Sequence, residues 1–213
     1  MRKSTFFRFA LFGLALVGSN SHADQEGWTT QTTKDGKITV QSKVSSIKDA
    51  KGDEFPVVDY RASTIATANF SKCVALLLDV SKHKAINDDA LSETVETLSD
   101  HEWILHYDLN TPWPLPKSDC ISKMTYTGDS AQKTATFVFT AAPTRWKATS
   151  ARRMAIYDLT YHLKDLGSGR IELTSVGRGS PPFKVPLWMV RAGLPGSISD
   201  PLARIVKLSG SVR

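Results

Sequence analysis

The sequence lacks the short motifs that mark the common catalytic and cofactor sites. It contains no Gly-x-Ser-x-Gly nucleophile elbow and no glycine-rich phosphate loop, and its Gly-x-Gly stretches at 167–169 and 177–179 lack the remaining glycine of a dinucleotide fingerprint. The carboxylates at 49–54 and 88–89 lie in polar stretches with no visible division into acid and base. We therefore predict no catalytic residue and no cofactor.

Histidine and cysteine are also scarce. His101 and His106 are five residues apart, so on a strand their side chains point to opposite faces, and no metal site is predicted. Cys73 and Cys120, if bridged, would close a loop of 47 residues, which contributes about 4 kcal/mol on chain-entropy grounds. Cys73 also lies on the apolar stripe of a predicted helix, where a free cysteine serves as a small hydrophobe. The bridged and the free state both stay open.

No charge of one sign dominates the chain. Its 213 residues are 41% apolar and 23% charged, without internal repeats or a linker, which predicts one globular domain with a sizeable core. The net charge of +6 includes Arg2, Lys3 and Arg8 at the N-terminus. Without them the excess is +3, which argues against a nucleic-acid binder.

The N-terminus has the pattern of a secretory signal peptide. Basic Arg2 and Lys3 precede an apolar run at 9–17, and small residues lead to Ala23. The alternative, a membrane anchor, needs about 20 apolar residues, and this run is well short of that. We expect cleavage after Ala23, leaving residues 24–213 as an exported, periplasmic or secreted domain.

The remaining pattern predicts an α+β fold. A short lead-in at 27–33, expected to be helical, ends at a Lys-Asp-Gly turn, and two strands at 38–44 and 55–66 precede a helix from Phe70 to about Lys84 capped by Asn69. Period-two segments separated by turns then predict an antiparallel meander. These segments cover residues 93–98, 102–108, 119–127, 134–141, 154–166 and 170–176.

The last segment has helical spacing. Apolar residues recur every three or four positions from Leu187 to Ile205, which predicts a long C-terminal helix that begins at Pro186 and is kinked or broken near Pro195. The inward faces of three strands are apolar as well. Alternation places Phe137 and Phe139 on the same face of the sheet, and it places Leu159 on one face together with the residues two positions before and after it. We expect this sheet face and the helix stripe to pack together.

Three prolines flank a tryptophan in the segment 111–116, Thr-Pro-Trp-Pro-Leu-Pro. With the residues that follow, this segment resembles the START domain, the helix-grip family of lipid-binding proteins. The resemblance rests on Pro112-Trp113-Pro114 with Asp119, Arg153 with Tyr161 and Leu163, Pro186 with Trp188, Tyr60-Arg61-Ala62 and Leu77-Leu78-Asp79. The sequence departs from the family pattern near Ile86 and at Ser118, Tyr161, Pro182 and Phe183. These departures concern the mouth and the wall of the expected cavity, so no ligand is carried over from the family.

The resemblance implies a curved antiparallel sheet wrapped around a long C-terminal helix, with a tunnel for one lipid or sterol-like molecule between them. We expect a monomeric carrier with transient membrane contact. The alternatives are an aromatase/cyclase-like enzyme and a structural envelope protein with a filled interior. The expected ligand-binding residues are Trp103, Phe137, Phe139, Arg153, Leu159, Tyr161, Leu163, Leu173, Leu187, Val190, Leu194 and Ile198.

Two further expectations concern polar and mobile parts of this site. Arg153 should be partly buried and either pair with a carboxylate such as Glu102 or Asp108 or meet a polar ligand head; the alternative is an exposed base beside Arg152. The loops at 112–116 and 179–183 should form the gate, with Trp113 and Phe183 as its apolar contacts.

Overall fold

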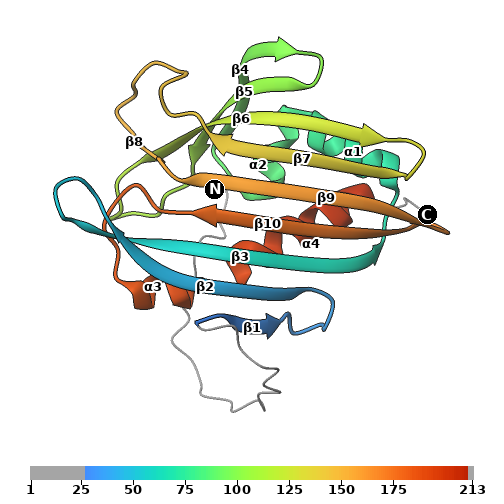
Figure 1. Cartoon of the computed structure of the whole chain (residues 1–213), viewed down its shortest axis with the longest axis horizontal. Helices are drawn as coiled ribbons and strands as arrows, with labels where there is room; N and C mark the ends of the chain where they lie inside the picture. The colour runs from blue at the N-terminus through green and yellow to red at the C-terminus, as the bar shows by residue number, and fades with distance from the viewer. Residues whose placement is uncertain (1–26, 211–213) are drawn as a thin grey trace, which may run out of the picture.

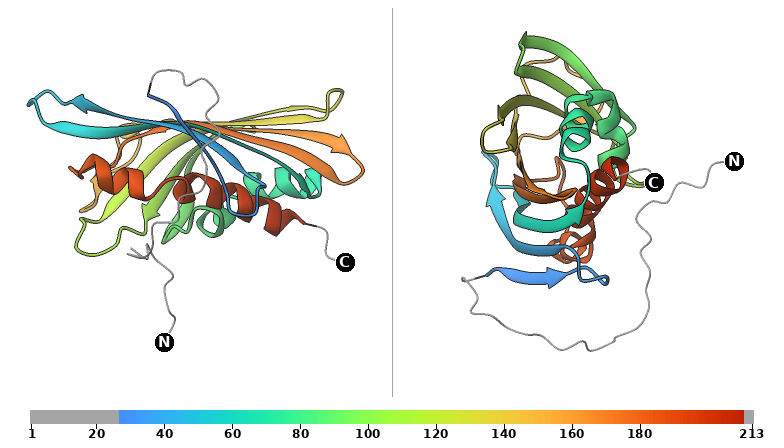
Figure 2. Two further views of the ribbon diagram at one scale, coloured as in Figure 1. Left: turned by 90° about the horizontal axis from the view of Figure 1, so that it is seen from below. Right: turned by 90° about the vertical axis from the view of Figure 1, so that its right-hand side faces the viewer.

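A computed structural model describes residues 27–210 of the chain. The predicted signal peptide, residues 1–23, lies outside the described residues. The described part forms an arched sheet whose concave face is covered by helices (Figures 1 and 2). No helix within residues 27–210 is both long enough and apolar enough to cross a membrane.

Nine strands of the sheet follow the order β1-β2-β3-β10-β9-β7-β6-β5-β4, and every neighbouring pair on this path is antiparallel. The short β8 pairs with β6 in parallel. The strands are β1 Thr29–Thr32, β2 Thr39–Lys48, β3 Glu54–Thr67, β4 Leu91–Ser99, β5 Glu102–Leu109, β6 Ser118–Asp129, β7 Thr134–Ala141, β8 Arg152–Arg153, β9 Tyr157–Gly167 and β10 Arg170–Gly179. The predicted meander is confirmed. The pairing of β10 with β3 joins the N-terminal strands to the rest of the sheet.

The N-terminal lead-in is a strand, so its prediction as a helix is wrong. β1 pairs with β2 from Thr29 opposite Ser42 to Thr32 opposite Thr39. The turn between them was predicted correctly: Gly36 has a positive φ of 72°, and the Asp35 carboxylate accepts hydrogen bonds from Thr33 and from the Lys37 amide. A turn of this kind closes a hairpin, and β-branched threonines favour the extended partner.

The first helical region is broken where a single helix was predicted. α1 covers Phe70–Leu78, a 3-10 helix covers Val80–Lys82, and α2 covers His83–Asn87. Asn69 caps α1 as expected, its Oδ1 accepting from the Lys72 amide at 2.9 Å. The break occurs at Asp79, whose carboxylate accepts from the Ser81 amide and hydroxyl and so starts a new helix instead of continuing the old one.

The C-terminal helix is broken near Pro195, as predicted. α3 covers Leu187–Ala192 and α4 covers Gly196–Ser209. Pro195 has no amide hydrogen to continue α3, and its carbonyl accepts from the amides of Ile198 and Ser199 to begin α4. The inward stripe of α4, with Leu202 and Ile205 fully buried, packs along the concave face of the sheet. Figure 2 shows the sheet curving around this helix.

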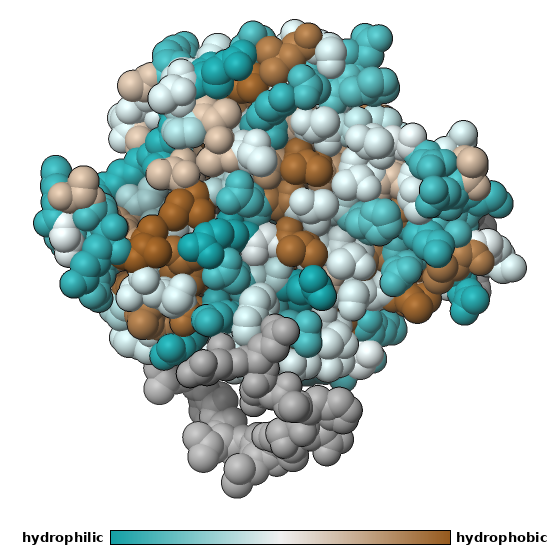
Figure 3. Space-filling model, viewed as in Figure 1, coloured by the Kyte–Doolittle hydropathy of each residue, from teal (hydrophilic) through white to brown (hydrophobic). Residues whose placement is uncertain are grey.

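Alternation along the strands separates a buried face from an exposed one. Phe137 lies opposite Tyr161, and Phe139 opposite Leu159, all four on the concave side and buried. On the convex side Val138 is exposed. Hydrophilic side chains cover much of this face, and apolar ones gather on its left side in the view of Figure 3. Cys73 and Cys120 are both free and buried, so the bridged alternative is wrong.

Candidate functional site

A cavity of about 490 Å³ lies between the ends of the central strands and helices α3 and α4. Most of its lining side chains are apolar. The sheet and its loops contribute Val58, Tyr60, Leu109, Asn110, Thr111, Pro112, Leu115, Ser118, Met154, Tyr157, Asp158, Arg178, Gly179, Ser180, Pro181, Pro182, Phe183 and Val185; the helices contribute Met189, Val190, Gly193, Leu194, Ser197 and Ile198. This size and lining suit one small hydrophobic molecule.

Tyr60 forms part of the cavity wall because its neighbour has no side chain. Tyr60 on β3 is paired with Gly177 on β10, and a methyl group added to Gly177 would fall 2.5 Å from the phenol. The ring therefore lies across the glycine backbone, a packing that any larger residue at 177 would prevent.

The two proline-rich loops both contribute to the cavity wall. Residues of the 110–115 loop and of the 180–185 loop line the cavity. Phe183 points inward and is 8% exposed, whereas Trp113 points to solvent and is 92% exposed. Both predicted gate loops thus contribute to the cavity wall, but their aromatic side chains face different surroundings, and the gate itself stays a prediction.

The other half of the interior is filled. Behind the cavity, between the sheet and α1 and α2, the space is a void of only about 10 Å³. His83 anchors this region: its Nε2–H donates to the Leu77 carbonyl at 2.8 Å, so its Nδ1 accepts from the Tyr107 hydroxyl at 2.9 Å. Burial lowers the pKa of His83, which keeps the ring neutral in this arrangement.

The residues expected to bind ligand divide between these two halves. Val190, Leu194 and Ile198 line the cavity. Phe139, Leu159 and Tyr161 border the small void. The remaining apolar residues expected to bind ligand line neither the cavity nor the small void; they are Phe137, Leu163, Leu173 and Leu187. The first three of these are fully buried in the core. The predicted tunnel is therefore a cavity beside α3 and α4, and only a small void lies beyond it between the sheet and α1 and α2.

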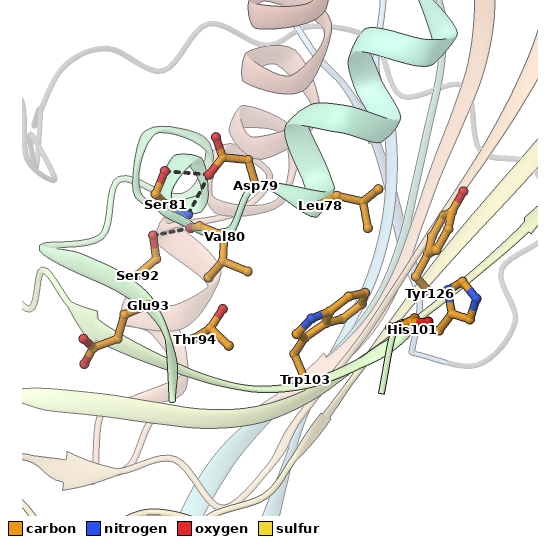
Figure 4. A pocket seen from close by; sticks show the side chains of 11 residues that line it. Leu78, Asp79, Val80, Ser81, Ser92, Glu93, Thr94, His101, Trp103 and Tyr126 are labelled. Carbon is orange, nitrogen blue, oxygen red and sulfur yellow. Dashed lines mark hydrogen bonds between the residues drawn. The ribbon is translucent and has the colours of Figure 1, made fainter. Parts of the chain in front are cut away.

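Trp103 lies in a separate groove of about 670 Å³ between β4, β5 and the end of α1. Figure 4 shows its indole beside Leu78 and Thr94, with Tyr126 and His101 further along the groove. The carboxylate residue Glu93 also lines this groove. This groove does not include any residue of the cavity, so Trp103 is not part of the cavity wall.

Arg153 is partly buried, as expected, but its partner is Asp119 instead of Glu102 or Asp108. Its Nε and Nη2 donate to the two Asp119 oxygens at 3.1 and 2.7 Å. Its remaining hydrogens reach the carbonyls of Pro143, Trp146 and Lys147, which fixes the 142–151 loop. Arg153 does not line the cavity.

Electrostatics around Asp119 follow from this pairing. Burial by itself raises the pKa of Asp119, but hydrogen bonds from Arg153 and Thr149 outweigh it and hold the pKa below its ordinary value. His106 also lies near, with its Nε2 3.8 Å from the Asp119 carboxylate and its Nδ1 bonded to Glu93. The group is a structural clamp that holds a loop to β6.

Several cavity residues were missing from the predicted set, among them Tyr60, Leu109, Met154, Tyr157 and Met189. Tyr157 was detectable, because it shares the inward face of β9 with Leu159 and Tyr161. Met154 and Leu109 lie at strand ends and loops, where neither alternation nor helical spacing indicates a direction.

Comparison with solved structures identifies the fold. The STAR-related lipid transfer protein of Xanthomonas axonopodis (fragment 25–204) aligns with a TM-score of 0.67 at 19% identity, covering 85% of this chain and 98% of that one. The lipid transfer and protein localization domain of human StarD13 (DLC2) aligns with a TM-score of 0.68 at 23% identity, over 87% and 90%. No family sequence profile and no curated protein matches the chain. The chain thus has the helix-grip fold of START domains.

A more distant similarity links the fold to an enzyme. The Zhui aromatase/cyclase from Streptomyces sp. R1128 aligns with a TM-score of 0.50 at 10% identity, over 72% of this chain and 91% of that one. At these identities the similarities define the architecture, and function has to be argued from the cavity.

Proposed function

We propose that the protein is an exported, periplasmic carrier that holds a lipid or other hydrophobic molecule in the cavity beside α3 and α4. The observation that carries this proposal is the 490 Å³ cavity itself, which is mostly apolar and is lined in part by two proline-rich loops. We place its mouth between these loops. Each 100 Å² of ligand surface removed from water contributes about 2.5 kcal/mol, so such a site binds hydrophobic molecules without specific chemistry. The START lipid transfer structures with this fold support the same function.

Binding is favoured over catalysis by the chemistry of the lining. Among the described residues that line the cavity there is no histidine, cysteine, lysine or glutamate. Asp158 and Arg178 follow inward-facing Tyr157 and Gly177 by one position, so their side chains point to the outer face. The cavity thus presents hydroxyl and amide groups to a ligand but no ionisable pair for acid and base work. The filled-interior alternative is opposed by the cavity volume.

Export gives the first test. If the segment before Asp24 is a cleaved signal peptide, protein isolated from the periplasm should have the intact mass of residues 24–213. The expected N-terminus is Asp24, because small residues at 21 and 23 precede it. A periplasmic form that retains residues 1–23 would contradict the export proposal.

Membrane contact should occur at the mouth. Trp113 is 92% exposed in one mouth loop, and Trp188 is 60% exposed on α3. The two residues that follow Trp188 in the chain line the cavity. Figure 2 shows α3 and the β5–β6 loop at the same end of the molecule. Exposed tryptophans at the opening of an apolar cavity are suited to the interface of a bilayer.

Replacing Trp113 with alanine should therefore slow lipid transfer several-fold while equilibrium binding is retained, since Trp113 does not line the cavity. The measurement is transfer of a fluorescent lipid between vesicles. Trp146→Ala, on the 142–151 loop and outside the cavity, is the matched control and should transfer at the parent rate. Equal rates for both variants and the parent would mean that Trp113 is not a membrane contact.

A further inference from the structure

Tyr157 is the polar group placed deepest in the cavity. It lies on the inward face of β9 and borders both the cavity and the small void behind it, so it forms the back wall. Among residues 27–210 no side chain or backbone group forms a hydrogen bond with its hydroxyl. By contrast, the buried hydroxyl of Tyr107 is used by His83. An unpaired hydroxyl beside an apolar cavity is able to form a hydrogen bond with a polar atom of a bound ligand.

The surroundings of Tyr157 keep it uncharged. Burial raises the pKa of Tyr157 well above its ordinary value, and the neighbouring Tyr107, Cys120, Tyr161 and Tyr60 raise it further. The phenol is therefore a neutral donor and acceptor throughout the physiological pH range.

The back of the cavity also contains no cation. Arg178 is the one lysine or arginine among the lining residues, and its guanidinium pairs with Asp59 on the neighbouring strand at 2.7 Å. Both side chains belong to the outer face of the sheet by alternation. A carboxylate or phosphate carried to Tyr157 would lie in an apolar cavity without a counter-charge, which is strongly unfavourable.

The volume limits the ligand further. A methylene group occupies about the same volume as a water molecule in the liquid, roughly 30 Å³, so 490 Å³ accommodates about 16 such groups. This is enough for one alkyl chain of medium length or a compact ring system. It is too little for both chains of a phospholipid, because the filled half of the interior removes the remaining space.

We propose that the ligand is a single-chain or compact-ring molecule that enters with an uncharged oxygen first, a hydroxyl or a carbonyl, and that the Tyr157 hydroxyl binds this oxygen. This inference rests on the proposed function, since it requires that the cavity holds a hydrophobic ligand. A long-chain alcohol or ketone fits the description. A fatty acid or a phospholipid acyl chain does not, because its charged group would have to stay at the mouth.

The test uses the purified, delipidated protein loaded with the neutral fluorescent probe N-phenyl-1-naphthylamine. The probe is displaced with 1-dodecanol, dodecane or dodecanoate. Dodecanol should bind more tightly than dodecanoate. Tyr157→Phe should weaken dodecanol binding roughly 2- to 10-fold, the range expected for one neutral hydrogen bond, and leave dodecane unchanged. Tyr161→Phe is the matched control: the same strand and face and the same lost oxygen, but outside the cavity lining.

Each outcome decides a different point. Loss of dodecanol affinity in Tyr157→Phe alone supports the inference. If Tyr157→Phe binds dodecanol as tightly as the parent does, and dodecane binding is also unchanged, the role of Tyr157 is overturned but the carrier function stands. Dodecanoate binding as tightly as dodecanol overturns the requirement for an uncharged oxygen. If the parent protein takes up neither the probe nor any of the three molecules, the proposed function itself fails.

Discussion

Replacing Arg153 with methionine should lower the free energy of unfolding by about 3–5 kcal/mol, because it removes one partner of a buried ion pair. The Asp119 side chain is 1% exposed and that of Arg153 is 15% exposed. Methionine preserves the length and packing of the side chain but leaves the Asp119 charge without its bidentate partner. It also leaves three loop carbonyls, those of Pro143, Trp146 and Lys147, without their donor.

Urea unfolding of the variant measures this effect. Arg152→Met is the matched control, since Arg152 belongs to the same two-residue strand and is exposed; its loss should change stability by less than about 0.5 kcal/mol. A stability of Arg153→Met equal to that of Arg152→Met would contradict the clamp described here.

The same pair predicts a pH dependence. The pKa of Asp119 is lowered in the folded protein, so the stabilisation is complete at neutral pH and is lost as pH falls below about 4, the ordinary aspartate value, through the lowered pKa. In Arg153→Met the Arg153 bonds are gone while burial and the Thr149 bond remain, so the pKa of Asp119 is higher than in the parent and its carboxylate is protonated more readily in the folded variant. The stability gap between parent and variant should therefore narrow as pH falls below 4.

Filling the cavity should abolish ligand binding without unfolding the protein. Leu194 on the loop between α3 and α4 lines the cavity, so the larger side chain in Leu194→Trp has open space to occupy. Phe139 belongs to the filled half, where the same change, Phe139→Trp, has no space and should cost about 1–3 kcal/mol by overpacking. The two variants should thus separate binding from stability.

Probe binding and thermal unfolding of both variants provide the measurement. Leu194→Trp is expected to lose at least tenfold in probe affinity with little change in melting temperature, and Phe139→Trp to retain binding with a lowered melting temperature. Destabilisation of both variants to a similar extent, with probe binding unchanged in Leu194→Trp, would mean that the interior is filled at both positions.

Periodicity predicted the parts of the fold that repeat. Alternation along β7, β9 and β10 indicated the buried face, and the spacing from Leu187 to Ile205 indicated the helix that packs on it. Three residues of the helical stripe, Val190, Leu194 and Ile198, line the cavity. Residues of both proline-rich loops line the cavity, because residues that cannot continue a strand or helix are left at the ends of elements; their role as a gate stays a prediction.

What the sequence did not predict depends on contacts between distant segments. Phe139 is not open to ligand because Leu77, His83 and Ile86 of α1 and α2 pack over it, and no local pattern indicates which helix covers which strand. The partner of Arg153 follows from the register of a two-residue strand, β8, which places Arg153 opposite Asp119. A strand of two residues carries no periodic signal.

Native mass spectrometry of the protein isolated from its own periplasm tests the central claim most directly. The parent protein should carry one small hydrophobic molecule that is released on denaturation, and Leu194→Trp, purified in parallel, should carry none. Parent protein that has the bare mass of the chain, and stays bare after incubation with a lipid extract of the same cells, would contradict the account.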